Sequence, residues 1–298
     1  MILSDDRVIV NRFKITPNYS VSYVQDLDAV YSHYKRPTLN KSNGMLSHKA
    51  ISRMRTALNW MLLFSKVKRV YSKVTKQSFT FKVAFITVTL SANQTHTDKE
   101  ILHQMLFPFL KYLERKHQCM MYVWRAEIQG ERLRNRGERC IHFHIAIDKF
   151  VHYLHIRNKW NALQRRHGYT TIEADANSTD VHAVRSRKDC VAYMSKYITK
   201  AVVSDSEKVN CKVWGMSRNF SLMDITLREE SDLNYFSEVQ HFTSTFSQEV
   251  KQLEYAKVYF HAIDLSSKVT LSIAAGFKKC YQLYTKGVES RTQYTIDF

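Results

Sequence analysis

Apolar and polar residues alternate strictly along residues 141–148 (IHFHIAID). This period of two predicts a β-strand that turns its isoleucines and phenylalanine to one face and His142, His144 and Asp148 to the other. Neutral imidazole is the commonest metal ligand in proteins. The pattern therefore places two metal ligands side by side, unless the strand is an exposed edge strand whose histidines only face solvent.

A second strand is predicted just before the first, at residues 120–129, with Arg125 and Glu127 on the same face. Residues 130–139 between the two strands contain Gly137 and read as a turn. We therefore expect an antiparallel hairpin with an arginine-rich tip. The arginines of this tip are Arg132, Arg134, Arg136 and Arg139. They are either contacts for a DNA backbone or part of a solvated loop.

The surrounding pattern indicates an α+β fold, with a central antiparallel sheet of about five strands and helices on one face. Beside the hairpin, a strand is expected at residues 82–90 and one or two short strands at 170–184. Helices are expected at residues 97–117, 152–167 and 186–203. Pro108 is expected to kink the first of these helices.

Three regions are expected along the chain: a partly helical flank at 1–80, a core at 81–220 and a mostly helical extension at 221–298. Residues 47–70 predict an amphipathic basic helix, which either packs on the core or contacts DNA. In the C-terminal extension, helices are expected at 230–252 and 269–286, with a possible strand at 256–263.

Charge points to the class of partner. The 298 residues include 45 Lys and Arg against 27 Asp and Glu, a formal net charge of +18. Such an excess favours a polyanionic partner, most often nucleic acid, over a merely solubilising surface. The five cysteines are widely spaced and form no CxxC pair, which favours the reducing cytoplasm. No run of 18 apolar residues occurs, so no membrane span is expected.

A third ligand for the two histidines is best sought on the neighbouring strand. Glu127 lies on its polar face and is the preferred candidate; Asp148, four positions beyond His144, is the alternative. Without a metal, Glu127 would be a surface carboxylate paired with Arg125 or Arg139. Two imidazoles and one carboxylate with open positions suit Mg²⁺ or Mn²⁺ better than a closed zinc site.

Residues 193–200 (YMSKYITK) repeat Tyr-x-x-Lys in tandem. On a helix, Tyr193 and Tyr197 lie one turn apart on the same face, with Lys196 and Lys200 beside them. A tyrosine phenolate can attack a phosphodiester and become linked to it, and lysine adds positive charge at the phosphate. The plainer interpretation is an amphipathic helix whose tyrosines edge the core.

Together these segments resemble the HUH endonucleases, specifically the two-tyrosine rolling-circle replication initiators of single-stranded DNA phages and related plasmids. Residues 85–90 (FITVTL) resemble the first motif, residues 142–144 (HFH) match the His-hydrophobe-His motif, and residues 193–200 resemble the third. Residues 213–218 (VWGMSR) are similar to a tract that follows the third motif. The resemblance covers roughly residues 82–220.

The resemblance implies nicking and joining of single-stranded DNA at a replication origin, through a 5′-phosphotyrosine and a free 3′-hydroxyl. It also implies a Mg²⁺ or Mn²⁺ site with an acidic third ligand, as Glu127 would provide. Many relatives use a single tyrosine, so roles for both Tyr193 and Tyr197 are an inference. Some relatives carry a fused helicase; no GxxxxGK[ST] loop occurs here, so a host helicase and polymerase are expected partners.

Two other functions fit the same residues. A transposase or relaxase would use the same chemistry, although relaxases usually place the tyrosine before the histidines. A non-catalytic DNA-binding regulator on a similar sheet would bind DNA without cleaving it.

Overall fold

The computed structural model describes residues 3–4, 7–16, 19–26, 44, 46–65, 68–72, 76–81, 83–173, 176–184, 207–218, 226–228, 241, 244–245, 247–254 and 256–261. The chain forms two compact units, one of residues 41–219 and one that joins residues 1–40 to residues 220–298. The α+β class expected from the sequence is confirmed.

The larger unit is built on a five-stranded antiparallel sheet in the order β10-β7-β8-β6-β9. Its strands are β6 (Val83–Thr89), β7 (Tyr122–Ile128), β8 (Ile141–Ile147), β9 (Thr179–Val184) and β10 (Trp214–Met216). The expected hairpin of β7 and β8 is confirmed, with Glu127 opposite His142 and Arg125 opposite His144. This register puts the acidic and imidazole side chains on one face.

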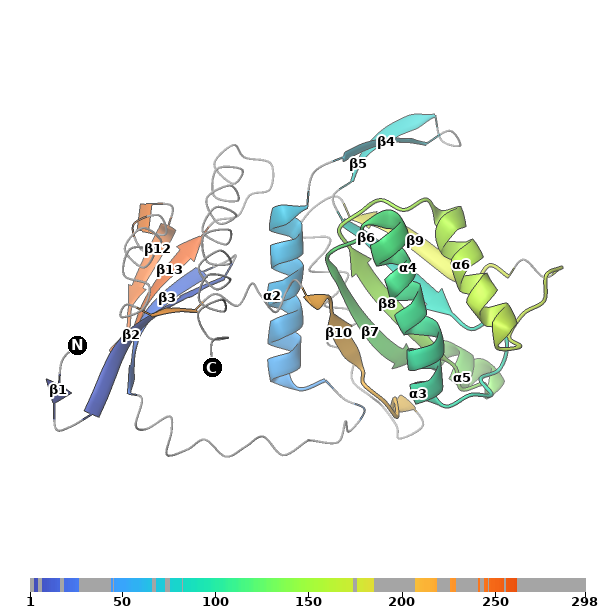
Figure 1. The fold of residues 1–298 in the computed structure, drawn as a ribbon, viewed down its shortest axis with the longest axis horizontal. Helices are drawn as coiled ribbons and strands as arrows, with labels where there is room; N and C mark the ends of the chain where they lie inside the picture. Colours follow the sequence, from blue (N-terminus) through green and yellow to red (C-terminus); the bar gives the residue numbers. More distant parts are fainter. Residues whose placement is uncertain are drawn as a thin grey trace, which may run out of the picture. The chain divides into compact units, whose positions relative to one another are not determined.

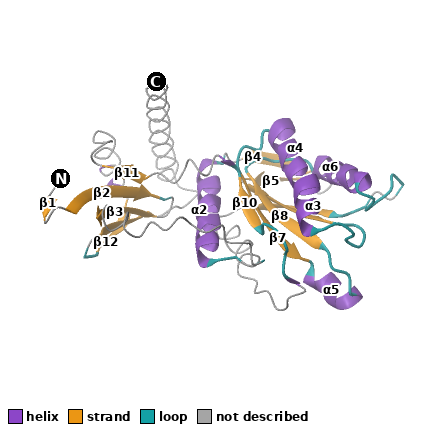
Figure 2. Ribbon diagram, turned by 60° about the horizontal axis from the view of Figure 1, so that its bottom comes forward, coloured by secondary structure: helices purple, strands orange, loops and turns teal. Residues whose placement is uncertain are grey.

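The helices of this unit are α2 (His48–Phe64), α3 (Asp98–Ile101), the π-helical turn η1 (Leu102–Leu106), α4 (Phe107–His117), α5 (Gly130–Arg136) and α6 (Tyr153–Arg166). Figures 1 and 2 show α3, α4 and α6 on the same side of the sheet. Within the part of the chain that the structure describes, no helix is long and apolar enough to cross a membrane.

The main core lies between these helices and the aliphatic face of the strands. Phe143 and Ile145 of β8 are fully buried there, and Trp160 of α6 packs edge-on against Phe143 with ring centroids 6.3 Å apart. Burial of such side chains contributes about 1.5–3 kcal/mol each. The opposite face of the sheet is divided: Val83, Phe85 and Val123 are buried at one end, and the polar hairpin residues occupy the other.

Gly215 explains why the tract at residues 213–218 needs a glycine. It lies opposite Trp124 where β10 pairs with β7. A Cβ at this position would come within 2.7 Å of the Trp124 indole nitrogen. Only a residue without a side chain lets the edge strand approach the indole so closely.

Several local expectations are corrected. The segment at 130–139 is the short helix α5 rather than a turn; it ends at Gly137, whose φ of 68° suits a glycine. The helix expected at 47–70 stops at Phe64, and residues 68–72 form strand β4 (Lys68–Ser72), paired with β5 (Gln77–Phe81). The helix at 97–117 is confirmed, with the widened η1 turn just before Pro108, whose ring cannot fit a regular α-helical turn.

The smaller unit is a sheet assembled from both ends of the chain. Its strands are β1 (Leu3–Ser4), β2 (Arg7–Ile15), β3 (Tyr19–Asp26), β11 (Thr226–Arg228), β12 (Ser247–Gln252) and β13 (Ala256–His261). N-terminal β3 pairs with C-terminal β13. The strand expected near 256–263 is confirmed, whereas the helix expected at 230–252 is wrong where β12 forms. The helices expected at 186–203 and 269–286 lie outside the described residues.

Candidate metal centre and DNA interface

The hairpin register brings three ligand-type side chains to a single point. The Glu127 Oε1 atom lies 2.8 Å from His142 Nε2 and 3.1 Å from His144 Nε2. The ligand atoms of the three residues all lie within 4.8 Å of one another. All three residues are largely shielded from solvent, and His144 is only 3 % exposed. The cluster that the alternation predicted can therefore hold one metal ion.

Thr87 orients His144 from the other side. Strand β6 pairs with β8 so that Thr87 lies opposite His144, and the Thr87 hydroxyl is 3.0 Å from His144 Nδ1. A hydroxyl can donate to an unprotonated Nδ1 or accept from a protonated one. Thr87 can therefore keep the ring in place whichever nitrogen carries the proton, which leaves Nε2 directed at Glu127.

Burial and hydrogen bonding set the charges of the cluster. Burial opposes ionisation of Glu127, but hydrogen bonds from His142 and His144 outweigh it and hold the pKa of the carboxyl well below its usual range. Burial lowers the pKa of His144 to about 4. At neutral pH the cluster thus presents a carboxylate and a neutral imidazole, the forms that bind metal.

Arg125 is a buried cation beside this cluster that sequence reasoning treated only as a surface partner of Glu127. Its Nη2 atom lies 3.8 Å from Glu127 Oε2. Its Nε and Nη1 atoms are buried and have no hydrogen-bond partner among the described residues. A guanidinium remains charged at neutral pH, so it places a positive charge next to the candidate ligands.

Asp148, the alternative third ligand, is not part of the cluster. It follows the far end of β8, where its backbone N–H donates to the Met121 carbonyl at 3.1 Å. Burial raises the pKa of its carboxyl. Glu127 is therefore the acidic member of the group that the structure assembles.

The four arginines of the hairpin tip have different surroundings. Arg139 donates two hydrogen bonds to Asp98, of 2.8 and 2.7 Å, and is committed to the fold. Arg132 pairs with Glu138 and donates to the Leu90 carbonyl at 2.8 Å.

The other two tip arginines are more accessible. The Arg134 side chain is 64 % exposed and lies 3.5 Å from Glu207. Arg136 is exposed and forms no ion pair with any residue that the structure describes. Arg134 and Arg136 are thus the members of the set best placed to meet an external phosphate.

Tyr193, Lys196, Tyr197 and Lys200 lie outside the described residues, so their expected proximity to the cluster stays a prediction. The structure adds Thr87 and Arg125 to the site, and each had a weak signal. Thr87 has the same alternation in residues 85–90, and Arg125 shares the face of Glu127. Their pairing partners across the sheet were not apparent from the chain.

Comparison with known proteins points the same way. No curated protein and no solved structure matches the chain. Residues 83–202 match the family model for the ORF2-type replication-associated protein. That segment contains Glu127, His142 and His144 and extends beyond Lys200. The region that builds the candidate site is therefore similar to a family of replication-associated proteins, which supports a role in the initiation of DNA replication.

Proposed function

We propose that this protein is a replication initiator that nicks and rejoins single-stranded DNA at an origin during rolling-circle replication. The observation that carries the proposal is the Glu127–His142–His144 cluster, which lies in the same matched segment as the tandem Tyr-x-x-Lys motif. A buried metal site and a tyrosine nucleophile are the two components that this chemistry requires.

In the proposed reaction the phenolate of Tyr193 or Tyr197 attacks the scissile phosphorus. The bond between phosphorus and the 3′-oxygen breaks, the 3′-oxygen leaves and takes up a proton, and the 5′-phosphate stays on the tyrosine. Attack by a 3′-hydroxyl reverses these steps and rejoins the strand. The second tyrosine would let one DNA end be held while another is cut.

The surrounding residues lower the barrier by charge. Glu127, His142 and His144 would hold Mg²⁺ or Mn²⁺, and when bound the ion supplies Lewis-acid polarisation of the phosphate oxygen. Lys196 and Lys200 stabilise the phenolate and the developing phosphate charge. The buried Arg125 guanidinium adds positive potential to the same face.

The partner is single-stranded origin DNA, in keeping with the net charge of +18. Because no phosphate-binding GxxxxGK[ST] loop occurs in the sequence, strand separation and synthesis would be left to a host helicase and polymerase. Such a protein would act in the cytoplasm of a bacterial host.

The test is to incubate the protein with a randomised single-stranded oligonucleotide library and Mn²⁺ and to look for a covalent adduct on a denaturing gel. We expect an adduct with the wild type, none with the Tyr193→Phe, Tyr197→Phe double variant, and an unchanged adduct with the control Tyr153→Phe, an exposed tyrosine of α6. Peptide mapping of the adduct names the nucleophile.

Other outcomes would contradict the proposal. Tight binding without an adduct under any divalent ion would indicate a non-catalytic regulator. Transfer between paired element ends would indicate a transposase. Survival of the adduct in the double variant would exclude both tyrosines as the nucleophile.

A further inference from the structure

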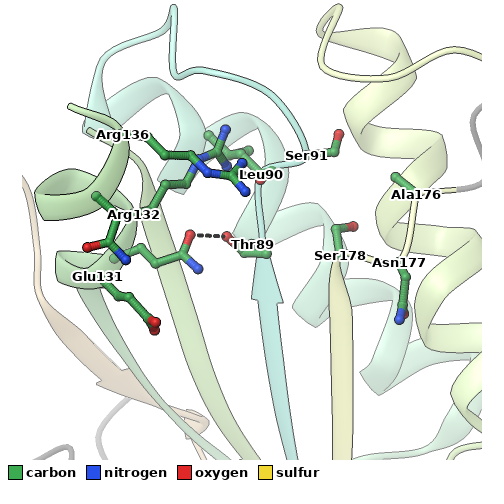
Figure 3. Close-up of a pocket in the computed structure, with 11 residues that line it drawn as sticks. Thr89, Leu90, Ser91, Glu131, Arg132, Arg136, Ala176, Asn177 and Ser178 are labelled. Carbon is green, nitrogen blue, oxygen red and sulfur yellow. Dashed lines mark hydrogen bonds between the residues drawn. The ribbon is translucent and has the colours of Figure 1, made fainter. Parts of the chain in front are cut away.

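A cavity of about 460 Å³ opens where β6 ends, between α5 and the start of β9. Figure 3 shows Glu131, Arg132 and Arg136 on one side of Thr89 and Ala176, Asn177 and Ser178 on the other. Its volume lies within the range of about 300–1,000 Å³ that is typical of small-ligand sites. The cavity is large enough for a single nucleotide and is lined mainly by polar residues.

The cavity begins next to the metal cluster. Thr89 lies opposite the ligand His142 in the β6–β8 pairing, and its hydroxyl donates to Gln129 Oε1 at 3.3 Å. Gln129 is two residues beyond Glu127, which is about 7 Å along an extended chain. A DNA strand whose phosphate lay at the cluster would therefore bring a neighbouring nucleotide to the cavity.

A buried hydrogen-bond network holds the wall formed by β6 and β9. Gln164 of α6 is fully buried; its Oε1 accepts from the Ser91 N–H at 2.7 Å and its Nε2 donates to Ser178 Oγ at 2.7 Å. Asn161, 1 % exposed, accepts from Ser178 Oγ at 3.1 Å and donates to the Ala176 carbonyl at 2.9 Å. This wall is preformed rather than assembled on binding.

The opposite wall is fixed by α5. Arg132 donates to the carbonyl of Leu90 at 2.8 Å and pairs with Glu138, so its charge is already used. Arg136 remains as the exposed cation on this side of the cavity. One wall thus offers a phosphate contact without any cost to the fold.

The remaining lining groups suit a base edge. Gln129, Asn135 and Asn177 each present an amide, and Glu131 adds a carboxylate. Amide side chains form paired hydrogen bonds with adenine, and carboxylates accept from the amino group of cytosine. The lining contains no aromatic ring, so recognition would rest on hydrogen bonds rather than on stacking.

We propose that this cavity binds one unstacked nucleotide of the single strand next to the cleavage point, and that it selects a base with an exocyclic amino group over thymine. The inference rests on the proposed function for the identity of the strand. Asn135, Asn177 and Glu131 contact the base edge, and Arg136 contacts a phosphate.

The first arm of the test reads the cleavage site. The randomised library is cut with Mn²⁺, and the junction sequences of the adducts are compared for the wild type, Asn135→Ala, Asn177→Ala and the control Asn158→Ala. All three asparagines are exposed, so the variants should fold. We expect one position beside the junction to disfavour thymine by about tenfold, and this preference to disappear in Asn135→Ala and Asn177→Ala only.

The second arm needs no cleavage. Fluorescence anisotropy with single-stranded oligo(dA), oligo(dC) and oligo(dT) 12-mers should show about tenfold weaker binding of oligo(dT) by the wild type. Asn177→Ala should remove this difference. Arg136→Ala should weaken all three oligonucleotides alike and reduce the salt dependence, whereas Arg115→Ala, an exposed arginine of α4, should not.

The two arms separate the two proposals. Cleavage with a base preference that both asparagine variants retain would overturn the cavity inference and leave the nicking function standing. Absence of cleavage, together with a base preference that Asn177→Ala abolishes, would overturn the nicking function and support the cavity. Competition by free dAMP as effective as that by the oligonucleotide would overturn recognition of a strand in favour of a mononucleotide site.

Discussion

Two carboxylates of the larger unit, Asp98 and Glu127, are both buried and both have a pKa held below the usual range, yet their surroundings differ in kind. Asp98 accepts two hydrogen bonds from Arg139, one from the Asn210 N–H at 2.8 Å and one from Gln94 at 2.7 Å. Glu127 faces two imidazoles through a single oxygen.

The difference teaches that a lowered pKa does not by itself mark a functional site. Arg139 cannot lose its proton or bind metal, so the Asp98 cluster can only hold α3 to the β8 hairpin and to residues near Asn210. Imidazoles exchange a proton for a metal ion, so the Glu127 cluster can change its occupant. The identity of the partners separates a structural ion pair from a candidate ligand set.

The largest effect should come from Asp98→Ala, which breaks the structural pair. We expect the free energy of unfolding to fall by about 3 kcal/mol, because Arg139 and the Asn210 N–H lose their acceptor. Urea denaturation measures this loss. Glu114→Ala, an exposed carboxylate of α4, is the control and should change stability little. A large loss of Mn²⁺ affinity in Asp98→Ala that exceeds its unfolded fraction would break the distinction between the two clusters.

Glu127→Gln should show the converse. Mn²⁺ affinity measured by titration calorimetry should fall at least about 100-fold, since removal of a direct ligand costs more than the roughly 10–100-fold typical of second-shell changes. The loss of stability should be smaller than in Asp98→Ala, because the amide oxygen can still accept from the imidazoles. Wild-type affinity in this variant would remove Glu127 from the ligand set.

Thr87→Val tests how His144 is oriented. The substitution keeps the shape but removes the hydroxyl that lies 3.0 Å from Nδ1. We expect Mn²⁺ affinity to fall about tenfold. Thr95→Val, a threonine outside the cluster, is a matched control, and equal losses in both variants would argue against a positioning role for Thr87.

The smallest effect is a pH dependence of the Asp98 pair. Burial opposes ionisation of Asp98, but the bonds from Arg139, Asn210 and Gln94 prevail and lower its pKa in the folded state. Its contribution to stability is therefore fully present above the unfolded pKa near ~3.9 and is lost as the pH falls through the lower folded value.

The unfolding free energy of wild type minus that of Asp98→Asn should accordingly stay constant between about pH 5 and 7. Below about pH 4 it should shrink, by at most about 1.4 kcal/mol per pH unit. Denaturation curves at a series of pH values measure it, and titrations common to both proteins cancel in the difference. A gap that widens in acid would contradict the ion-pair interpretation.

The candidate ligands were accessible from the sequence because the signals are local. Alternation in residues 141–148 assigned His142 and His144 to one face, and the short connection from residue 129 made Glu127 their neighbour. The structure confirms this grouping. The error at residues 130–139 was local too: Gly137 suggested a turn but ends a short helix.

Long-range pairing was not accessible in this way. Nothing in the periodicity of residues 19–26 or 256–261 indicates that β3 and β13 lie side by side, since the energy of a strand pair depends on which distant segment packs against it. The same holds for Thr87 opposite His144, and for Arg139, which sequence reasoning assigned to DNA but which binds Asp98.

The sequence by itself determined the faces of the strands, because side-chain direction in an extended chain follows from its period of two. It thereby determined that two imidazoles and a carboxylate would share one surface. Only the tertiary structure decided which arginines remain available, which hydroxyl supports His144 and where a cavity opens beside the cluster. Those properties arise from contacts between segments that are far apart in the chain, and a local pattern carries no information about such contacts.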